Sequence, residues 1–143
     1  MKHFLLLLTV FLFSISLHAQ GISGVYTSDY STYQDDVNPE NNLNENNLFH
    51  IALDIEDDNK GMVAVQDSRT PDEILFFEIE SFLDVLRTEE RDMIIYQAHT
   101  VHLPEPKETK IIIYFKKDKS MNLMINYADT SQIYHDLTHI KKE

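Results

Sequence analysis

Residues 48–56 read LFHIALDIE, and apolar side chains stand at every second position of this stretch. The alternate set consists of Phe49, Ile51, Leu53 and Ile55. Successive side chains of an extended chain point to opposite faces, so these side chains share one face, while the other face is mostly polar or small. The pattern predicts a half-buried β-strand whose apolar face lies in the core.

Runs of the same kind continue along the chain. Residues 62–67 follow a short turn that contains Gly61, which predicts a hairpin with residues 48–56. Further strand-like runs occupy residues 21–29, 73–80, 92–101, 110–115, 121–127 and 132–140. No long helical pattern alternates with them, which argues against parallel βαβ units. We therefore predict an all-β fold, an antiparallel meander of seven or eight strands in a small up-and-down barrel, with a two-sheet β-sandwich as the alternative.

Three segments are less regular. Residues 28–47 are rich in Asn, Asp and Ser, which predicts a long surface loop. Residues 81–91 fit either a short helix or a bent continuation of the preceding strand. Residues 131–141 are rich in β-branched and aromatic side chains and favour a strand, with a capped amphipathic helix as the alternative.

The chain begins with an apolar leader. Residues 2–19 read KHFLLLLTVFLFSISLHA, with one basic residue, an apolar run and a small residue at the end, which is the layout of a secretory signal peptide. We expect residues 1–19 to be removed and residues 20–143 to form a single exported β domain, periplasmic or secreted, with an uncleaved anchor as the alternative. The chain has no cysteine, so disulfides, thiolate chemistry and lipid anchoring through a cysteine are excluded.

The composition is strongly acidic, with a formal net charge of −12. Such a surface repels nucleic-acid phosphates and anionic lipids, so we expect neither a nucleic-acid partner nor a membrane span after leader cleavage. Solubility is the simplest reason for the charge, and a specific cationic partner is the alternative.

Metal-binding patterns are weak. His135 and His139 would be neighbours only on a helix, because on a strand they would lie about 13 Å apart. The acidic stretch that begins at Asp54 lacks the Gly and Glu spacing of an EF-hand. An acidic turn explains it better than weak Ca²⁺ binding at Asp57 and Asp58. We predict no metal site and no cofactor.

Motifs for catalysis are also lacking. The sequence contains no Gly-x-Ser-x-Gly motif, and its 3 glycines form no phosphate-binding loop. We therefore predict a protein that is not an enzyme, with a hydrolase as the less favoured option.

Several strands are apolar on both faces. The predicted interior face, which would line a ligand cavity if the barrel is hollow, carries Phe49, Ile51, Leu53, Phe77, Ile95, Ile113, Phe115, Leu123 and Ile125. The opposite face, a candidate protein interface, carries Ile94, Tyr96, Ile112 and Tyr114. A sheet with one wet face should alternate with polar residues, so the second face needs a cover, either from the chain itself or from a partner.

The two ends of the domain resemble a known family. The opening Gly24-Val25-Tyr26 and the closing YHDLTHI, residues 134–140, are similar to small exported lipocalin-like bacterial proteins. Tyr26 stands where Trp is commoner, and His139 stands where another basic residue is usual. The resemblance implies a barrel that the first strand opens and the last strand closes.

Two functions follow as expectations. The first is an exported, non-enzymatic binding protein that holds a small apolar ligand inside the barrel, although many interior side chains are large and favour a filled core. The second is a protein–protein interaction or structural module that uses the apolar strand faces and could form a homo-oligomer.

Overall fold

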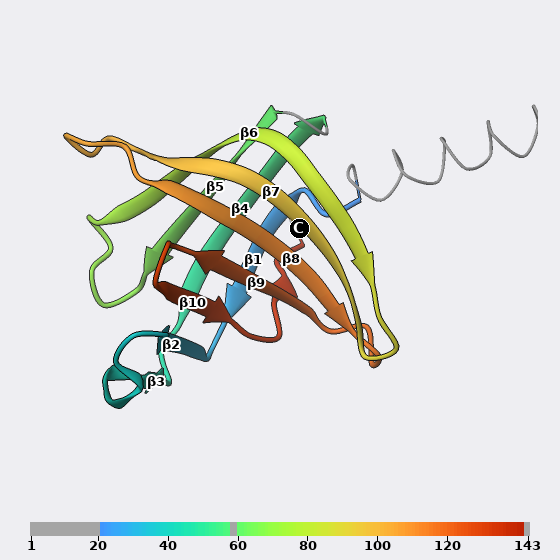
Figure 1. Ribbon diagram of the computed structural model, residues 1–143, viewed down its shortest axis with the longest axis horizontal. Coiled ribbons are helices and arrows are strands. Elements are labelled where there is room, and N and C mark those ends of the chain that lie inside the picture. Colours follow the sequence, from blue (N-terminus) through green and yellow to red (C-terminus); the bar gives the residue numbers. More distant parts are fainter. Residues whose placement is uncertain (1–20, 58–59, 142–143) are drawn as a thin grey trace, which may run out of the picture.

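The computed structural model describes residues 21–57 and 60–141, so the expected leader at residues 1–19 and the side chains of Asp57 and Asp58 lie outside the description. Within the described part, eleven strands form one antiparallel sheet in the order β11-β1-β4-β5-β6-β7-β8-β9-β10-β2-β3, curled into a half-barrel (Figure 1). The strands are β1 (Gly24–Ser28), β2 (Ser31–Asp35), β3 (Leu43–Glu45), β4 (Phe49–Asp57), β5 (Lys60–Asp67), β6 (Ile74–Arg87), β7 (Arg91–Val101), β8 (Glu108–Lys116), β9 (Met121–Asn126), β10 (Thr130–Tyr134) and β11 (Thr138–His139). The all-β antiparallel prediction is confirmed, while the predicted strand number and the two-sheet alternative are wrong.

The β4–β5 hairpin forms as the alternation predicts. Phe49 pairs with Asp67, and Ile51 pairs with Val65, in a regular antiparallel register that is interrupted between Ile55 and Asp57. The apolar face of β4 is buried along its whole length, with exposed fractions of 4% or less from Phe49 to Ile55. Hydrophobic periodicity therefore fixed the register here, because a slip of one residue would turn this face to water.

Strands β1 and β2 are separated by only two residues and pair with different parts of the sheet. Strand β1 pairs with β4, while β2 pairs with β10. The bend lies at Asp29 and Tyr30, where the backbone N–H of His135 donates a hydrogen bond to the Tyr30 carbonyl at 3.0 Å. The segment 24–35 thus joins the first and last long strands of the β4–β10 meander.

The segment 28–47 was predicted to be a loop, and the structure corrects this. It contains β2, the short 3-10 helix η1 (Pro39–Asn41) and β3. Strand β2 carries mainly polar side chains and is held by its pairing with β10: Thr32 lies opposite Ile133, Gln34 opposite Ser131 and Asp35 opposite Thr130. An apolar alternation is therefore missing although the backbone is extended.

The segment 81–91 does not form a helix: residues 81–87 continue strand β6, residues 88–90 form a turn, and Arg91 begins β7. Irregularities in the pairing with β7 fall between Ile79 and Ser81 and between Phe82 and Asp84. Such bulges bend a strand and increase its twist, which explains why the period-two pattern breaks there. At the other end of the chain, residues 131–141 supply β10 and β11 and form no helix.

The inner face of the half-barrel is filled with side chains. Tyr96, Phe77, Ile111, Ile113 and Leu123 are fully buried, and they belong to one continuous core cluster. Burying a large apolar side chain stabilises a fold by about 1.5–3 kcal/mol, so this cluster is the main source of stability in a domain without disulfides.

Candidate functional site

A cavity of about 260 Å³ opens at the end of the half-barrel where β4 begins and β10 ends. We call it the mouth pocket. Its lining consists of Glu45, Phe49, Val65, Asp67, Arg69, Thr70, Glu73, Leu75, Gln132 and Tyr134. These residues come from β3, β4, β5, the β5–β6 turn, β6 and β10, so the pocket exists only after the sheet has curled.

The floor of the mouth pocket is apolar and aromatic. Phe49 and Tyr134 are each 4% exposed, and their rings meet edge to face with centroids 5.1 Å apart. Val65, which is also buried, lies beside them, and the half-exposed Leu75 stands at the rim. Edge-to-face aromatic pairs are favourable beyond the area that they bury, so this floor is well defined.

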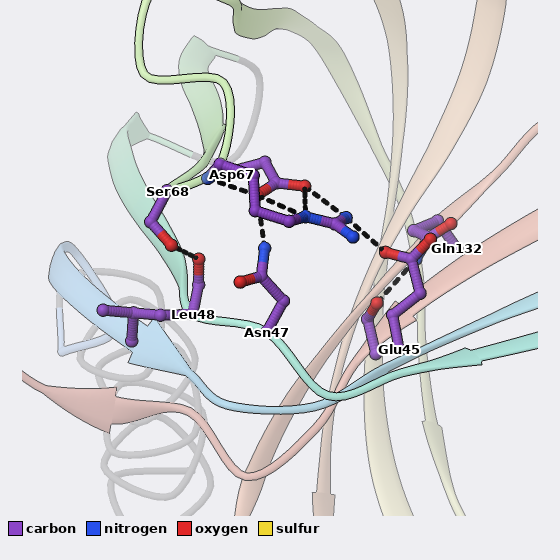
Figure 2. A network of polar contacts seen from close by, with 8 residues as sticks. Glu45, Asn47, Leu48, Asp67, Ser68 and Gln132 are labelled. Carbon is purple, nitrogen blue, oxygen red and sulfur yellow. Dashed lines mark hydrogen bonds and ion pairs between the residues drawn. The ribbon is translucent and has the colours of Figure 1, made fainter.

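One wall of the mouth pocket is built around Arg69, which joins Asp67 to Glu45, both labelled in Figure 2. Its guanidinium contacts the Asp67 carboxylate through Nη2 at 2.6 Å and through Nε at 3.1 Å. The same Nη2 contacts Glu45 at 3.0 Å. A planar guanidinium fits carboxylates in this two-nitrogen geometry, so Arg69 holds both acids in fixed positions.

Further hydrogen bonds tie this wall to the chain between β3 and β4. The Asn47 side-chain amide donates to Asp67, and the Ser68 hydroxyl donates to the Leu48 carbonyl at 2.7 Å (Figure 2). The backbone N–H of Arg69 donates to Asp67 at 2.8 Å. Two loops that are distant in sequence are thereby fastened together at the rim.

The lining continues beside Glu45 onto β2 and β10, since Ser31 on β2 pairs with Glu45 on β3. The Gln132 side-chain amide donates to the Ser31 hydroxyl at 2.9 Å, and Ser31 is fully buried (Figure 2). This bond uses one amide hydrogen of Gln132, whose side chain borders the pocket. This part of the lining is therefore polar, and the hydrogen bond to Ser31 holds the Gln132 amide in one orientation.

The ionisable groups of the site are perturbed in definite directions. Hydrogen bonds from Arg69 lower the pKa of Asp67, and those same contacts raise the pKa of Arg69. Burial raises the pKa of the Tyr134 phenol strongly, with a smaller effect from Glu45 and Asp67. At neutral pH Asp67 is therefore an ionised carboxylate, Arg69 a guanidinium cation and Tyr134 a neutral phenol.

The Tyr134 side chain is buried, but its hydroxyl is not one of the fully buried atoms that lack a hydrogen-bond partner in the described residues. Tyr134 borders the mouth pocket, so its phenol adds a polar group to the apolar floor.

The predicted interior set is placed mainly in the core. Seven of its members are buried in the core cluster: Phe49, Ile51, Leu53, Phe77, Ile113, Leu123 and Ile125. Phe115 is half-buried and packs against that cluster. Only Phe49 of the predicted set lines the mouth pocket, so the structure does not bring the set together around a central cavity.

Strand β7 reverses the predicted faces. Tyr96 is fully buried in the core and Ile94 packs against it, although both were expected at an outer interface. Ile95, expected inside, points to the opposite face. Residues 93–96 are all apolar, so this run does not indicate which of its side chains face the core. The next residues do, because Ala98 is buried and Gln97 is not, which places Ile94 and Tyr96 on the core side.

Ile112 and Tyr114 do lie on the outer face, as expected. Ile112 is half-buried and stands directly between Ile95 on β7 and Met124 on β9. Tyr114 is only 5% exposed, and the guanidinium of Arg91 lies 5.5 Å from its ring centroid. Part of the outer apolar surface is thus covered by the chain itself.

A second hollow, of about 480 Å³, lies on the outer face near the β4–β5 turn. Its lining is Asp54, Glu56, Lys60, Gly61, Met62, Glu78, Ile79 and Glu80. The neighbouring His99 contacts Glu80 at 2.8 Å and Glu78 at 3.5 Å. In the part of the chain that the structure describes, no group of three or more His, Asp or Glu side chains is arranged to hold a metal ion.

The sequence interpretation missed the residues that matter most for the mouth pocket. Arg69, Glu45 and the Gln132–Tyr134 pair come from three segments that are far apart in sequence, and the segments of Arg69 and Glu45 have no clear apolar pattern. The local signal that could have been used is the Asp67-Ser68-Arg69 order at a strand end, where an acidic side chain can accept hydrogen bonds from the following residues.

Comparison with known proteins does not extend this description. No family model, no curated protein and no solved structure was found to match the chain. Within the described residues, no helix has both the length and the apolar character needed to cross a bilayer.

Proposed function

We propose that this protein is an exported, non-enzymatic binding protein that holds one small ligand in the mouth pocket. The observation that carries the proposal is the pocket floor, where the Phe49–Tyr134 pair offers an aromatic surface beside the polar side chains of Arg69 and Gln132. Ligand sites are typically concave and apolar, with a few oriented polar groups, and this pocket has that composition.

The proposal places the ligand at the end of the half-barrel and not along its axis. The axial interior is occupied by large side chains such as Phe77, Tyr96 and Ile111, none of which is exposed. Small barrels of about eight strands often fill their interior in this way. We include in the proposal that the segment 24–35 closes a lipocalin-like barrel, since its two halves pair with β4 and β10.

A matched pair of substitutions tests the site. Leu75 and Ile74 are neighbours on β6 with similar exposure, 49% and 43%, but only Leu75 lines the mouth pocket. A library of small molecules is screened by chemical-shift perturbation on residues 20–143. We expect hits to shift the amides around Phe49, Asp67 and Tyr134, and Leu75→Trp to abolish these shifts while Ile74→Trp preserves them.

Two results would contradict the proposal. One is a screen without a hit on the wild-type protein. The other is a set of hits whose shifts map elsewhere and survive Leu75→Trp.

A second candidate function is a protein–protein interaction module, and one observation favours it. The half-buried Ile95, Ile112 and Met124 form an apolar row across β7, β8 and β9 on the outer face, and the buried Ile133 continues it on β10. Contiguous apolar surface of this kind often marks an interaction site. Sedimentation of the wild type and of an Ile112→Ser, Met124→Ser variant tests it: self-association should be present in the wild type and lost in the variant, and a wild type that stays monomeric speaks against a homo-oligomer.

A further inference from the structure

We infer that the mouth pocket takes a small organic cation, an amine whose ammonium group meets the carboxylates of the wall while its apolar part lies on Phe49 and Tyr134. This inference rests on the proposed function, because it names the class of ligand for that same pocket. It starts from the charges and the partners of the lining residues.

The lining carries an excess of negative charge. Glu45, Asp67 and Glu73 contribute three carboxylates, and Arg69 contributes one guanidinium. That guanidinium is already occupied by Asp67 and Glu45 at 2.6 and 3.0 Å. Glu73 forms no ion pair with any residue in 21–57 or 60–141, so its carboxylate is available to a ligand.

An anionic ligand does not suit this wall. A carboxylate or phosphate entering the pocket would meet three like charges, and it would have to take Arg69 from two acids that already hold it. A fatty acid is therefore a poor fit, although the floor is apolar. The field of the whole chain, with its net charge of −12, also raises the local concentration of cations.

The floor adds two contacts that suit an ammonium group. Tyr134 borders the cavity, and its phenol oxygen can accept a hydrogen bond from an ammonium N–H. The faces of aromatic rings attract cations, and Tyr134 and Phe49 both border the cavity. A neutral alcohol could use the Tyr134 hydroxyl but would gain nothing from the carboxylates.

Three probes of equal chain length separate these possibilities: hexylammonium, 1-hexanol and hexanoate. Binding to residues 20–143 is measured by chemical-shift titration at neutral pH and low salt. We expect hexylammonium to bind at least tenfold more tightly than 1-hexanol, hexanoate to cause no shifts at the pocket, and added salt to weaken only the hexylammonium complex.

Substitutions then locate the effect. Glu73→Gln should weaken hexylammonium binding severalfold without changing the affinity for 1-hexanol. Tyr134→Phe keeps the ring and should weaken both probes that can hydrogen-bond. The matched control is Glu89→Gln, in the β6–β7 turn outside the pocket lining, which removes the same charge and should change neither affinity.

The outcomes distinguish the inference from the function on which it rests. If 1-hexanol or hexanoate binds at the pocket as tightly as hexylammonium, the binding function stands and the cationic class is wrong. If hexylammonium binds but Glu73→Gln and Glu89→Gln act alike, the carboxylate contact is wrong. If no probe shifts the pocket residues, both the inference and the proposed function are overturned.

Discussion

Arg69 and Asp67 stand two residues apart at the end of β5, and two nitrogens of the guanidinium contact the carboxylate, the closer at 2.6 Å. The pair also reaches Glu45 and Asn47, so it joins the β5–β6 turn to the chain between β3 and β4. The effect of Arg69 on the pKa of Asp67 can be measured directly.

Replacing Arg69 by Ala should return the pKa of Asp67 upward toward 3.8, its ordinary value, because hydrogen bonds from Arg69 are the largest cause of the lowering. Carboxyl carbon chemical shifts, followed during an acid titration, report this pKa. Arg87→Ala, a cation at the far end of β6, is the control and should leave Asp67 unchanged. An unaltered Asp67 titration in Arg69→Ala would show that the turn holds the carboxylate without the guanidinium.

His135 should make the fold sensitive to mild acid. Burial lowers its pKa below the ordinary 6.5, Lys116 lowers it further, and Asp136 opposes this. Below pH 6.5 the unfolded chain takes up a proton that the folded chain does not yet bind, so the free energy of unfolding decreases until the pH reaches the lower folded pKa.

The expected result is a melting temperature that falls from about pH 7.5 to about pH 5.5, with a smaller fall in His135→Gln. Gln can still bond to Thr32, which contacts the His135 ring at 3.0 Å. Equal slopes in the wild type and in His135→Gln would show that His135 is not the source of the pH dependence.

Ile111 and Ile112 are adjacent on β8 but face opposite sides of the sheet. Ile111 is fully buried in the core cluster, whereas Ile112 is half-buried on the outer face. Ile111→Ala should cost about 2–5 kcal/mol of unfolding free energy, because it leaves a cavity, and Ile112→Ala should cost clearly less. Urea denaturation measures both values. Similar losses would mean that the outer face is covered as completely as the core.

Thr109 should tolerate the loss of its hydroxyl. It is 2% exposed, and its Oγ1 has no hydrogen-bond partner within the described part of the chain. Thr109→Val removes that unsatisfied group at nearly constant shape and should raise the free energy of unfolding by about 1 kcal/mol.

Thr100 provides the matched control for this substitution. It is similarly buried, but its hydroxyl accepts a hydrogen bond from the Lys107 backbone N–H at 2.8 Å. Thr100→Val should therefore be destabilising, by about 1–3 kcal/mol. Thermal or urea melts of the two variants should move in opposite directions, and a loss of stability in both would contradict the assignment of Thr109.

Gly61 lies where a larger residue has no room. A Cβ atom there would approach the carbonyl oxygen of Asp54 to 2.6 Å and the Cα of Ile55 to 3.0 Å. Both neighbours are backbone, so Gly61→Ala should force β4 and β5 apart and cost about 1–3 kcal/mol. The neighbouring Met62→Ala, at an exposed position, should change the melt little. A harmless Gly61→Ala would mean that the hairpin adjusts its bulge freely.

The sequence predicted the elements with clear alternation and failed where alternation is weak. In strand β4 the alternation from Phe49 to Ile55 predicts which side chains face the core, and each apolar side chain of that set is buried. Strand β7 is apolar on both faces over residues 93–96, so its orientation depended on pairing with β6 and β8. Strand β2 is polar on both faces and could be recognised only through its partner β10.

The candidate site was beyond the reach of local patterns. Its floor joins Phe49 to Tyr134 and its wall joins Arg69 to Glu45, contacts between residues that are far apart in sequence. Such contacts depend on how the sheet curls, which no single strand encodes. Phe49 was predicted to lie inside and it does, but its place in the floor of the mouth pocket depends on the curvature of the sheet.

The pairing of β1 with β11 brings Tyr26 opposite His139, and the Ile140 backbone N–H donates to the Val25 carbonyl at 2.7 Å. The two ends of the described chain are therefore neighbours. A circular permutant that links residue 141 to residue 21 through a short flexible linker, with new termini in the exposed turn at residues 102–106, should reproduce the same sheet. The order in which the strands are synthesised would then be free to change without altering their neighbours.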